Sequence, residues 1–327
     1  MGTIDTLSAG FRTTLRKPWL LIIPLLLDLV LEFGPKASIL PAYDAAVGAL
    51  NETLVAAQDL ADGELGGMLD TGEMGFLRGA IQEYNLFAII APSRLLLPNV
   101  ASLRPVDVEN DRIVEIASGG RLLGTTVLLL ALGLFVACTY WSLLAQETRG
   151  RRASLPEVIR SVPLFWLRGL AVVGLALVML MGMAGLGVAI SFVAEVFLVI
   201  GASFITQAIL SLFVLGTWLI ILWVAIYLFF VPQAITMSEA RPLLAVRQSL
   251  VIVRSRFWAS IGLILLINII TTGLSYLWSM LMGSTGGRMV SILANAYIGT
   301  GLLAATFIFF RDTVIALHQL QQQRSQQ

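Results

Sequence analysis

Two carboxylates, Asp28 and Glu32, are the side chains whose type and spacing could do chemistry. They lie four residues apart, one helical turn, in the apolar run 19–34. Asp28 is nine residues past Trp19, which is ~14 Å along a helix and close to the middle of a bilayer. A carboxylate there costs several kcal/mol unless it is paired, hydrated or protonated, so it is a candidate functional residue. The structural alternative is that Asp28 is neutral or hydrogen-bonded to another helix, while Glu32 reaches the external headgroups.

The Asp28 carboxylate needs polar partners, and these must come from other apolar runs. No lysine or arginine lies in the middle of such a run, so we expect no buried ion pair. One acid without a second relay group is also a poor fit to a proton pump. The sequence therefore predicts an intramembrane polar site that draws on Asp28, Glu32, Asn268 and Asn295, with Thr271, Thr272 and Gln207 as further candidate partners.

Signatures of catalysis and of cofactor binding are missing from the sequence. It has no phosphate-binding loop, no GxSxG, no HExxH and no paired carboxylates beside a histidine. The single cysteine, Cys138, excludes an intrachain disulfide, and the single histidine, His318, argues against zinc and haem sites. A net charge of +1 creates no field that attracts nucleic acid. We therefore expect no catalytic residue, cofactor or metal, and no nucleic-acid partner.

Composition indicates the class of protein that must position these carboxylates. Hydrophobic residues make up 57% of the 327 residues and charged residues 13%, against about 45–50% and 25% in soluble domains. The predicted fold is all-α: a polytopic integral membrane protein with six transmembrane helices, arranged as three hairpins with short amphipathic interfacial helices. A secretory signal peptide is the competing interpretation of residues 1–37, but Asp28 and Glu32 interrupt its apolar stretch. The predicted spans are 19–34, 122–145, 169–193, 206–231, 258–282 and 289–310, with an open boundary between the third and fourth.

The spans divide the chain into four regions. Residues 1–34 hold an N-terminal amphipathic helix and the first span, and 122–313 hold spans 2–6. Residues 314–327 form a polar cytoplasmic tail, which we expect to be a frayed helix end. The region 35–121 is acidic and mostly helical, and its predicted helices are 42–61 and 73–91, followed by an irregular or partly extended stretch.

The basic residues predict the orientation of the chain. Most of them lie on the inner side if the N-terminus is cytoplasmic, and the short external loops then hold only Arg288. Both termini are therefore predicted to be cytoplasmic and 35–121 external. On the inner side, Arg247, Arg254 and Arg256 are candidate contacts for anionic lipid headgroups. They have an equally good explanation as positive-inside anchors.

A threefold repeat of hairpins is one interpretation of the inner boundaries. Three segments place an amphipathic piece with arginine before a boundary tryptophan and a span, at Trp19, Trp166 and Trp258. Any membrane protein built from hairpins needs basic residues and aromatics at such boundaries. The repeat therefore stays one of two open alternatives.

The stretch between the fourth and fifth spans carries a resemblance to a known family, through Pro232, Glu239, Pro242, Ala245, Ser249, Phe257 and Trp258. It resembles the membrane domain attached to some bacterial glycerophosphodiester phosphodiesterases, and free-standing six-span relatives of that domain. The N-terminal GFRTTLRKPWLLIIPLLL is similar to the start of that family. The resemblance implies a bacterial plasma membrane and supplies no catalytic residue. The region 35–121 is larger than the family leads us to expect.

Two functions remain after these exclusions. The leading expectation is a non-enzymatic membrane protein, a scaffold or accessory subunit with protein partners in a membrane complex. The alternative is a transporter or channel for a small solute or lipid that uses Asp28.

Overall fold

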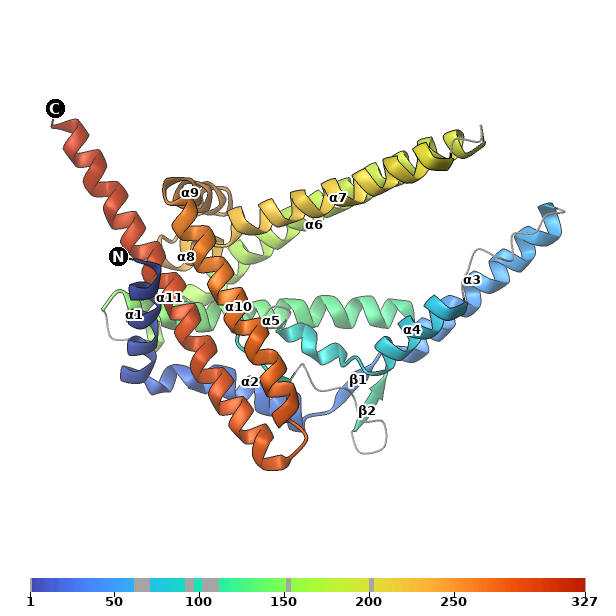
Figure 1. The fold of residues 1–327 in the computed structure, drawn as a ribbon. Helices are drawn as coiled ribbons and strands as arrows, with labels where there is room; N and C mark the ends of the chain where they lie inside the picture. Colours follow the sequence, from blue (N-terminus) through green and yellow to red (C-terminus); the bar gives the residue numbers. More distant parts are fainter. Residues whose placement is uncertain are drawn as a thin grey trace. The chain divides into compact units, whose positions relative to one another are not determined.

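The computed structural model describes residues 2–61, 71–91, 97–101, 112–150, 154–199 and 203–326. Helices dominate the ribbon in Figure 1. The elements in chain order are α1 (Thr3–Arg16), η1 (Pro18–Leu21), α2 (Ile22–Phe33), β1 (Lys36–Ser38), α3 (Leu40–Ala61), α4 (Thr71–Gln82), η2 (Leu86–Ile90), β2 (Ile113–Glu115), α5 (Gly119–Thr148), α6 (Leu155–Val199), α7 (Ser203–Leu228), α8 (Val231–Met237), α9 (Pro242–Ser255), α10 (Phe257–Leu281) and α11 (Thr285–Ser325), with η marking short 3-10 helices.

The chain divides into two compact units. Unit 1 comprises Met1–Thr13, Cys138–Ile267 and Ala304–Gln327, and unit 2 comprises Thr14–Ala137 and Asn268–Leu303. Helices α5, α10 and α11 are each continuous and contribute residues to both units.

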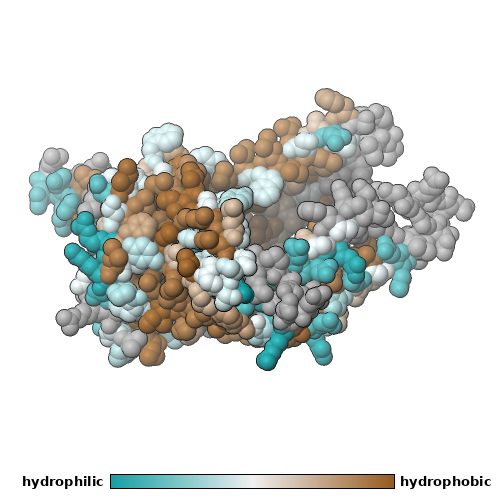
Figure 2. All heavy atoms as spheres, turned by 60° about the horizontal axis from the view of Figure 1, so that its bottom comes forward, coloured by the Kyte–Doolittle hydropathy of each residue, from teal (hydrophilic) through white to brown (hydrophobic). Residues whose placement is uncertain are grey.

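Membrane-spanning helices are the main feature of the described chain. Five helical segments are long and apolar enough to cross a membrane: Gly119–Thr148, Pro156–Ile190, Phe204–Met237, Phe257–Leu281 and Thr285–Gln323. Large apolar side chains such as Met181, Val188 and Trp218 are exposed along α6 and α7. Figure 2 shows hydrophobic residues over much of one face of the molecule. Such surface suits a lipid environment, as predicted from composition.

The first predicted span is not among these five segments. The chain leaves α1 at Lys17, whose backbone is not helical, and Pro18 then begins η1. Helix α2 follows with 12 residues, which rise only ~18 Å against a hydrocarbon core of ~30 Å. A proline in the first position of a helix is tolerated, but the residue before a proline is pushed out of the helical region. This break shortens the helix that carries Asp28 and Glu32.

Two predicted helix boundaries are wrong because the helices continue through them. The short inner helix expected before residue 169 is continuous with the third span, as the single 45-residue helix α6, which passes through Pro163. The polar tail expected from residue 314 is the end of α11, which runs to Ser325. The sequence has no proline or glycine after Gly301 to stop α11. The predicted bend near Gly201 lies outside the described residues.

Unit 2 contains most of the predicted external region. The helix predicted at 42–61 is confirmed by α3, but the helix predicted at 73–91 ends at Gln82 with α4. Asn85 explains this end, because its Oδ1 accepts hydrogen bonds from the backbone N–H of Phe87 (3.1 Å) and of Ala37 (3.0 Å). The first bond caps η2, and the second holds β1, which pairs in parallel with β2. These two strands were not predicted.

Gly133 is required where η2 crosses α5. A Cβ at this position would overlap the backbone carbonyl of Ile90. We therefore expect Gly133→Ala to destabilise the protein by about 2 kcal/mol, a typical cost of overpacking a core. Thermal unfolding of the full chain in detergent micelles would measure the change. Gly124→Ala on the same helix is the matched control, since its Cβ would meet nothing within 4 Å. Equal stability of the two variants would contradict the close approach.

Candidate functional site

Asp28 lies fully buried on α2 and binds the backbone of a loop in unit 2. Its Oδ1 accepts hydrogen bonds from the N–H of Val100 (2.7 Å) and of Ala101 (3.0 Å). The loop is held from within as well, because the Asn99 amide donates to the carbonyls of Ala91 (3.2 Å) and Leu97 (3.1 Å). Buried N–H groups outside regular structure need acceptors, and a carboxylate is a strong one. The carboxylate therefore fixes this loop on α2.

The predicted amide partners of Asp28 lie in different places. The Asn295 side chain, on α11, interacts with the carboxyl group. Among the described residues, neither Asp28 Oδ2 nor Asn295 Nδ2 has a hydrogen-bond partner. Asn268 is on α10 with its side chain exposed. Gln207 belongs to unit 1. The structure thus groups Asp28 with Asn295 and leaves two buried polar atoms unsatisfied beside each other.

Glu32 forms an ion pair that the sequence did not predict. Its side chain is fully buried, and Oε1 accepts a hydrogen bond from Arg288 Nη1 at 3.0 Å. The Arg288 side chain is 26% exposed, and its Nη2 also donates to the hydroxyl of Thr285 at 3.3 Å. The expectation of no buried ion pair is therefore wrong, as is the alternative that Glu32 reaches headgroups. Arg288 stands at the start of α11, so it reaches Glu32 without being in the middle of a span.

Lys36 completes the polar surroundings of α2. Its Nζ donates to the backbone carbonyls of Leu31 and Glu32, near the end of the helix. A cation there satisfies carbonyls that have no partner within the helix and complements the helix dipole. Lys36 also begins β1, so it links the end of α2 to the sheet.

Apolar packing encloses this polar cluster. Val100, Trp278 and Ile292 form a buried core, against which Leu25 of α2 packs. A Cβ on Gly299 would overlap Pro98, so the loop also approaches α11 closely. The elements around the cluster are thus α2, the 97–101 loop, α10 and α11, all within unit 2. Among the described residues there is no group of three or more His, Cys, Asp or Glu side chains that could hold a metal ion.

Comparison with protein-family models, curated proteins and solved structures finds no match to this chain. The resemblance seen in the stretch 232–258 therefore stays a prediction. The residues that carry it have structural contacts in unit 1. The Ser249 hydroxyl donates to the Tyr227 carbonyl (2.6 Å) and accepts from the Phe230 N–H (3.2 Å), which ties α9 to the end of α7. Ala245 is fully buried in α9.

The three predicted headgroup arginines lie on or after α9. Arg247 and Arg254 are exposed, and Arg256 is half-buried at the C-cap of the helix. In the part of the chain that the structure describes, no ion pair engages their side chains. Their accessibility suits both a headgroup role and a role as inner-side anchors, so the predicted contact stays a prediction.

Three other arginines bind helix ends, and sequence reasoning missed them. Arg149 donates to the carbonyls of Thr236 and Met237 at the end of α8. Arg311 donates to the carbonyl of Thr148, the last residue of α5. Free carbonyls at a helix C-terminus attract cations. The positive-inside rule already accounted for these arginines, so their sequence positions offered no further signal.

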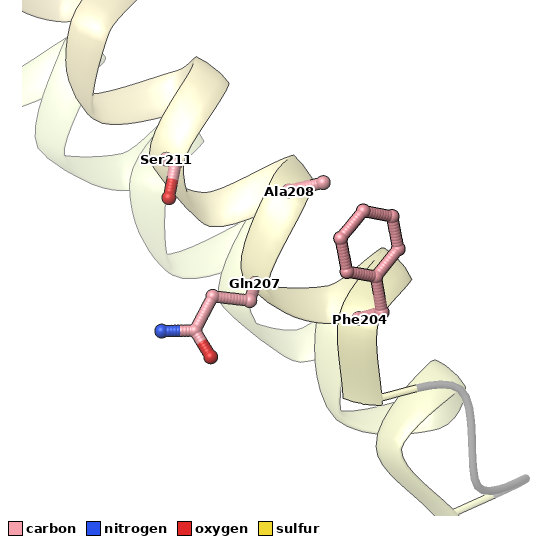
Figure 3. Close-up of a pocket in the computed structure, with 4 residues that line it drawn as sticks. All are labelled: Phe204, Gln207, Ala208 and Ser211. Atoms are coloured by element: carbon pink, nitrogen blue, oxygen red, sulfur yellow. The ribbon is translucent and has the colours of Figure 1, made fainter.

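Two hollows open on unit 1. One, of about 540 Å³, lies along α7 beside Phe204, Gln207, Ala208 and Ser211. Figure 3 shows Gln207 and Ser211 on one side of the helix and Phe204 and Ala208 on the other. The second, of about 310 Å³, lies where α5 ends and α6 begins, and it is lined mainly by polar side chains.

Proposed function

We propose that the protein is a non-enzymatic integral membrane protein that serves as a scaffold or accessory subunit of a membrane assembly. The use of its two buried carboxylates carries this proposal. Asp28 holds the 97–101 loop, and Glu32 pairs with Arg288. Each carboxylate thereby stabilises its own unit. A catalytic or relay acid would instead direct its oxygens at a substrate or a water.

The helices of the external region supply a contact surface for a partner. Arg78 of α4 donates to both oxygens of Asp44 on α3, at 2.9 and 3.0 Å, and thereby joins the two helices. This hydrogen bonding lowers the pKa of the Asp44 carboxyl and favours its ionised form. Leu50 on α3 and Leu77 on α4 are exposed. Exposed apolar residues on paired helices suit a protein partner.

Copurification of the tagged full chain from native membranes tests the proposal. We expect a stoichiometric partner after mild detergent extraction, identified by mass spectrometry. Leu77→Asp should weaken its recovery, while Glu52→Ala, an exposed change on α3, should not. Recovery of the chain as a lone monomer, with no protein enriched over an unrelated multi-span control, would overturn the proposal.

A transporter or channel for a small solute or lipid is the second candidate. It is favoured by the unsatisfied Asp28 Oδ2 and Asn295 Nδ2, because buried polar atoms without partners can bind water or a solute. Transport in proteoliposomes that is unchanged by Asp28→Asn would remove this site from consideration. Loss of transport in that variant, with the fold intact, would favour this candidate over the scaffold.

The orientation follows from the same proposal. A bacterial plasma membrane, cytoplasmic termini and an external 35–121 region require an even number of spans. Five segments meet the criteria for crossing, so η1 and α2 together would supply the sixth. A cysteine introduced at Glu52 should then react with an impermeant reagent in intact cells, while Cys138 is buried. Labelling only after the membrane is opened would contradict this orientation. The family resemblance, which also implies six spans, is part of the proposal.

A further inference from the structure

The 310 Å³ hollow of unit 1 brings together charged groups of both signs. It lies between the end of α5, the start of α6 and the end of α8, and its volume is at the lower end of the ~300–1,000 Å³ of ligand pockets. Its lining includes Arg149, Glu157, Arg160, Phe165, Thr236 and Glu239. Two guanidinium groups and two carboxylates therefore face one small polar space.

The charges in this hollow are held apart. Glu157 and Arg160 lie three residues apart on α6, yet they form no ion pair with each other, and no other described residue pairs with either side chain or with the Glu239 carboxylate. Arg149 is positioned by the two carbonyls at the end of α8. Charges of opposite sign that share a pocket without pairing leave each free for a ligand group of the opposite charge.

Glu239 adopts an unusual backbone conformation at the edge of the hollow. Its φ is 51°, and among the described residues it is the one non-glycine residue with positive φ. It follows the C-cap of α8, a position where glycine is common because it has no Cβ. The Glu239 carbonyl also accepts a hydrogen bond from Arg168. Strained residues of this kind cluster at binding sites.

We propose that this hollow binds the headgroup of a zwitterionic phospholipid. The phosphate would lie at Arg149 and Arg160, and the ammonium group at Glu157 and Glu239. A headgroup with phosphate alone would satisfy the arginines and leave two carboxylates that repel it. A lipid fits better than a soluble compound, because α6 exposes apolar side chains next to the hollow, at Ile159, Leu164 and Leu167.

Lipid titration of the purified full chain, followed by native mass spectrometry, tests this site. The probes are phosphatidylethanolamine, phosphatidylglycerol and the water-soluble phosphoethanolamine. We expect phosphatidylethanolamine to bind about tenfold more tightly than phosphatidylglycerol, the effect of one charge-assisted hydrogen bond. Equal binding of the two lipids would overturn the proposal. Phosphoethanolamine that binds as tightly as the lipid would assign the site to a soluble compound and overturn the lipid source.

Variants separate this site from general lipid association. Glu157→Gln and Arg160→Gln are exposed changes, and each should weaken phosphatidylethanolamine binding about tenfold. Arg12→Gln, an exposed change on α1, is the matched control. Unchanged binding in both variants, with unfolding as in the wild type, would place the lipid elsewhere. The experiment needs no protein partner, so its failure is distinguishable from failure of the scaffold proposal.

Discussion

Arg288→Leu should destabilise the protein by about 3 kcal/mol, the largest effect that we expect from a single change. The variant keeps Glu32 fully buried but removes the guanidinium that donates to it at 3.0 Å. Breaking a buried ion pair from one side leaves an uncompensated charge, which costs more than the pair contributes. Unfolding of the full chain in mixed micelles with increasing sodium dodecyl sulfate would measure the change.

The two sides of this ion pair are not equivalent. Glu32→Leu should cost less than Arg288→Leu, because the Arg288 side chain is 26% exposed and can reach water. The double variant should then be more stable than Arg288→Leu alone, since no buried charge remains at the site. Arg121→Leu, which removes an exposed arginine of unit 2, is the matched control. An Arg288→Leu protein that unfolds like this control would show that the pair is not buried in the native state.

Asp28→Ala should destabilise the protein by about 2–3 kcal/mol, because it leaves two buried N–H groups without an acceptor. The groups are those of Val100 and Ala101, both of which donate to the same carboxylate oxygen. Hydrogen exchange resolved by residue would locate the effect. We expect faster exchange at 97–101 and little change in α3 or α4, which Asp28 does not contact.

Asp28→Asn is the informative companion to that variant. The asparagine retains a carbonyl oxygen that can accept from both N–H groups, so it should keep most of the stability that Asp28→Ala loses. Its remaining cost is the weaker hydrogen bonding of a neutral acceptor. If Asp28→Ala unfolds and exchanges like the wild type, the carboxylate does not hold the loop, and the main observation behind the scaffold proposal is lost.

Sequence reasoning succeeded where burial in lipid is a local property. The fifth predicted span, 258–282, corresponds to α10 at Phe257–Leu281, and the second, 122–145, lies within α5. A helix in lipid satisfies its own backbone groups, so its position can be predicted from a run of apolar residues without knowledge of its neighbours. The same argument placed α3, where apolar residues recur with a helical period.

It failed where an element depends on distant residues. The strands β1 and β2 are three residues each and lie far apart in the chain. Their pairing needs the Asn85 hydrogen bond to Ala37, which spans 48 residues. No local pattern predicts such a strand, because strands this short have no alternation to recognise. The end of α4 depends on the same asparagine and was misplaced for the same reason.

The carboxylates show this division most clearly. The sequence by itself determined that Asp28 and Glu32 share a helix face in an apolar run, and that a charge there needs a partner. Only the tertiary structure decided the partners: backbone N–H groups 72 and 73 residues away for Asp28, and an arginine 256 residues away for Glu32. Every residue other than proline has a backbone N–H, so its use as a donor leaves no mark in the sequence. Arg288 was assigned to an external loop, and only the position of α11 beside α2 brings its long side chain to Glu32.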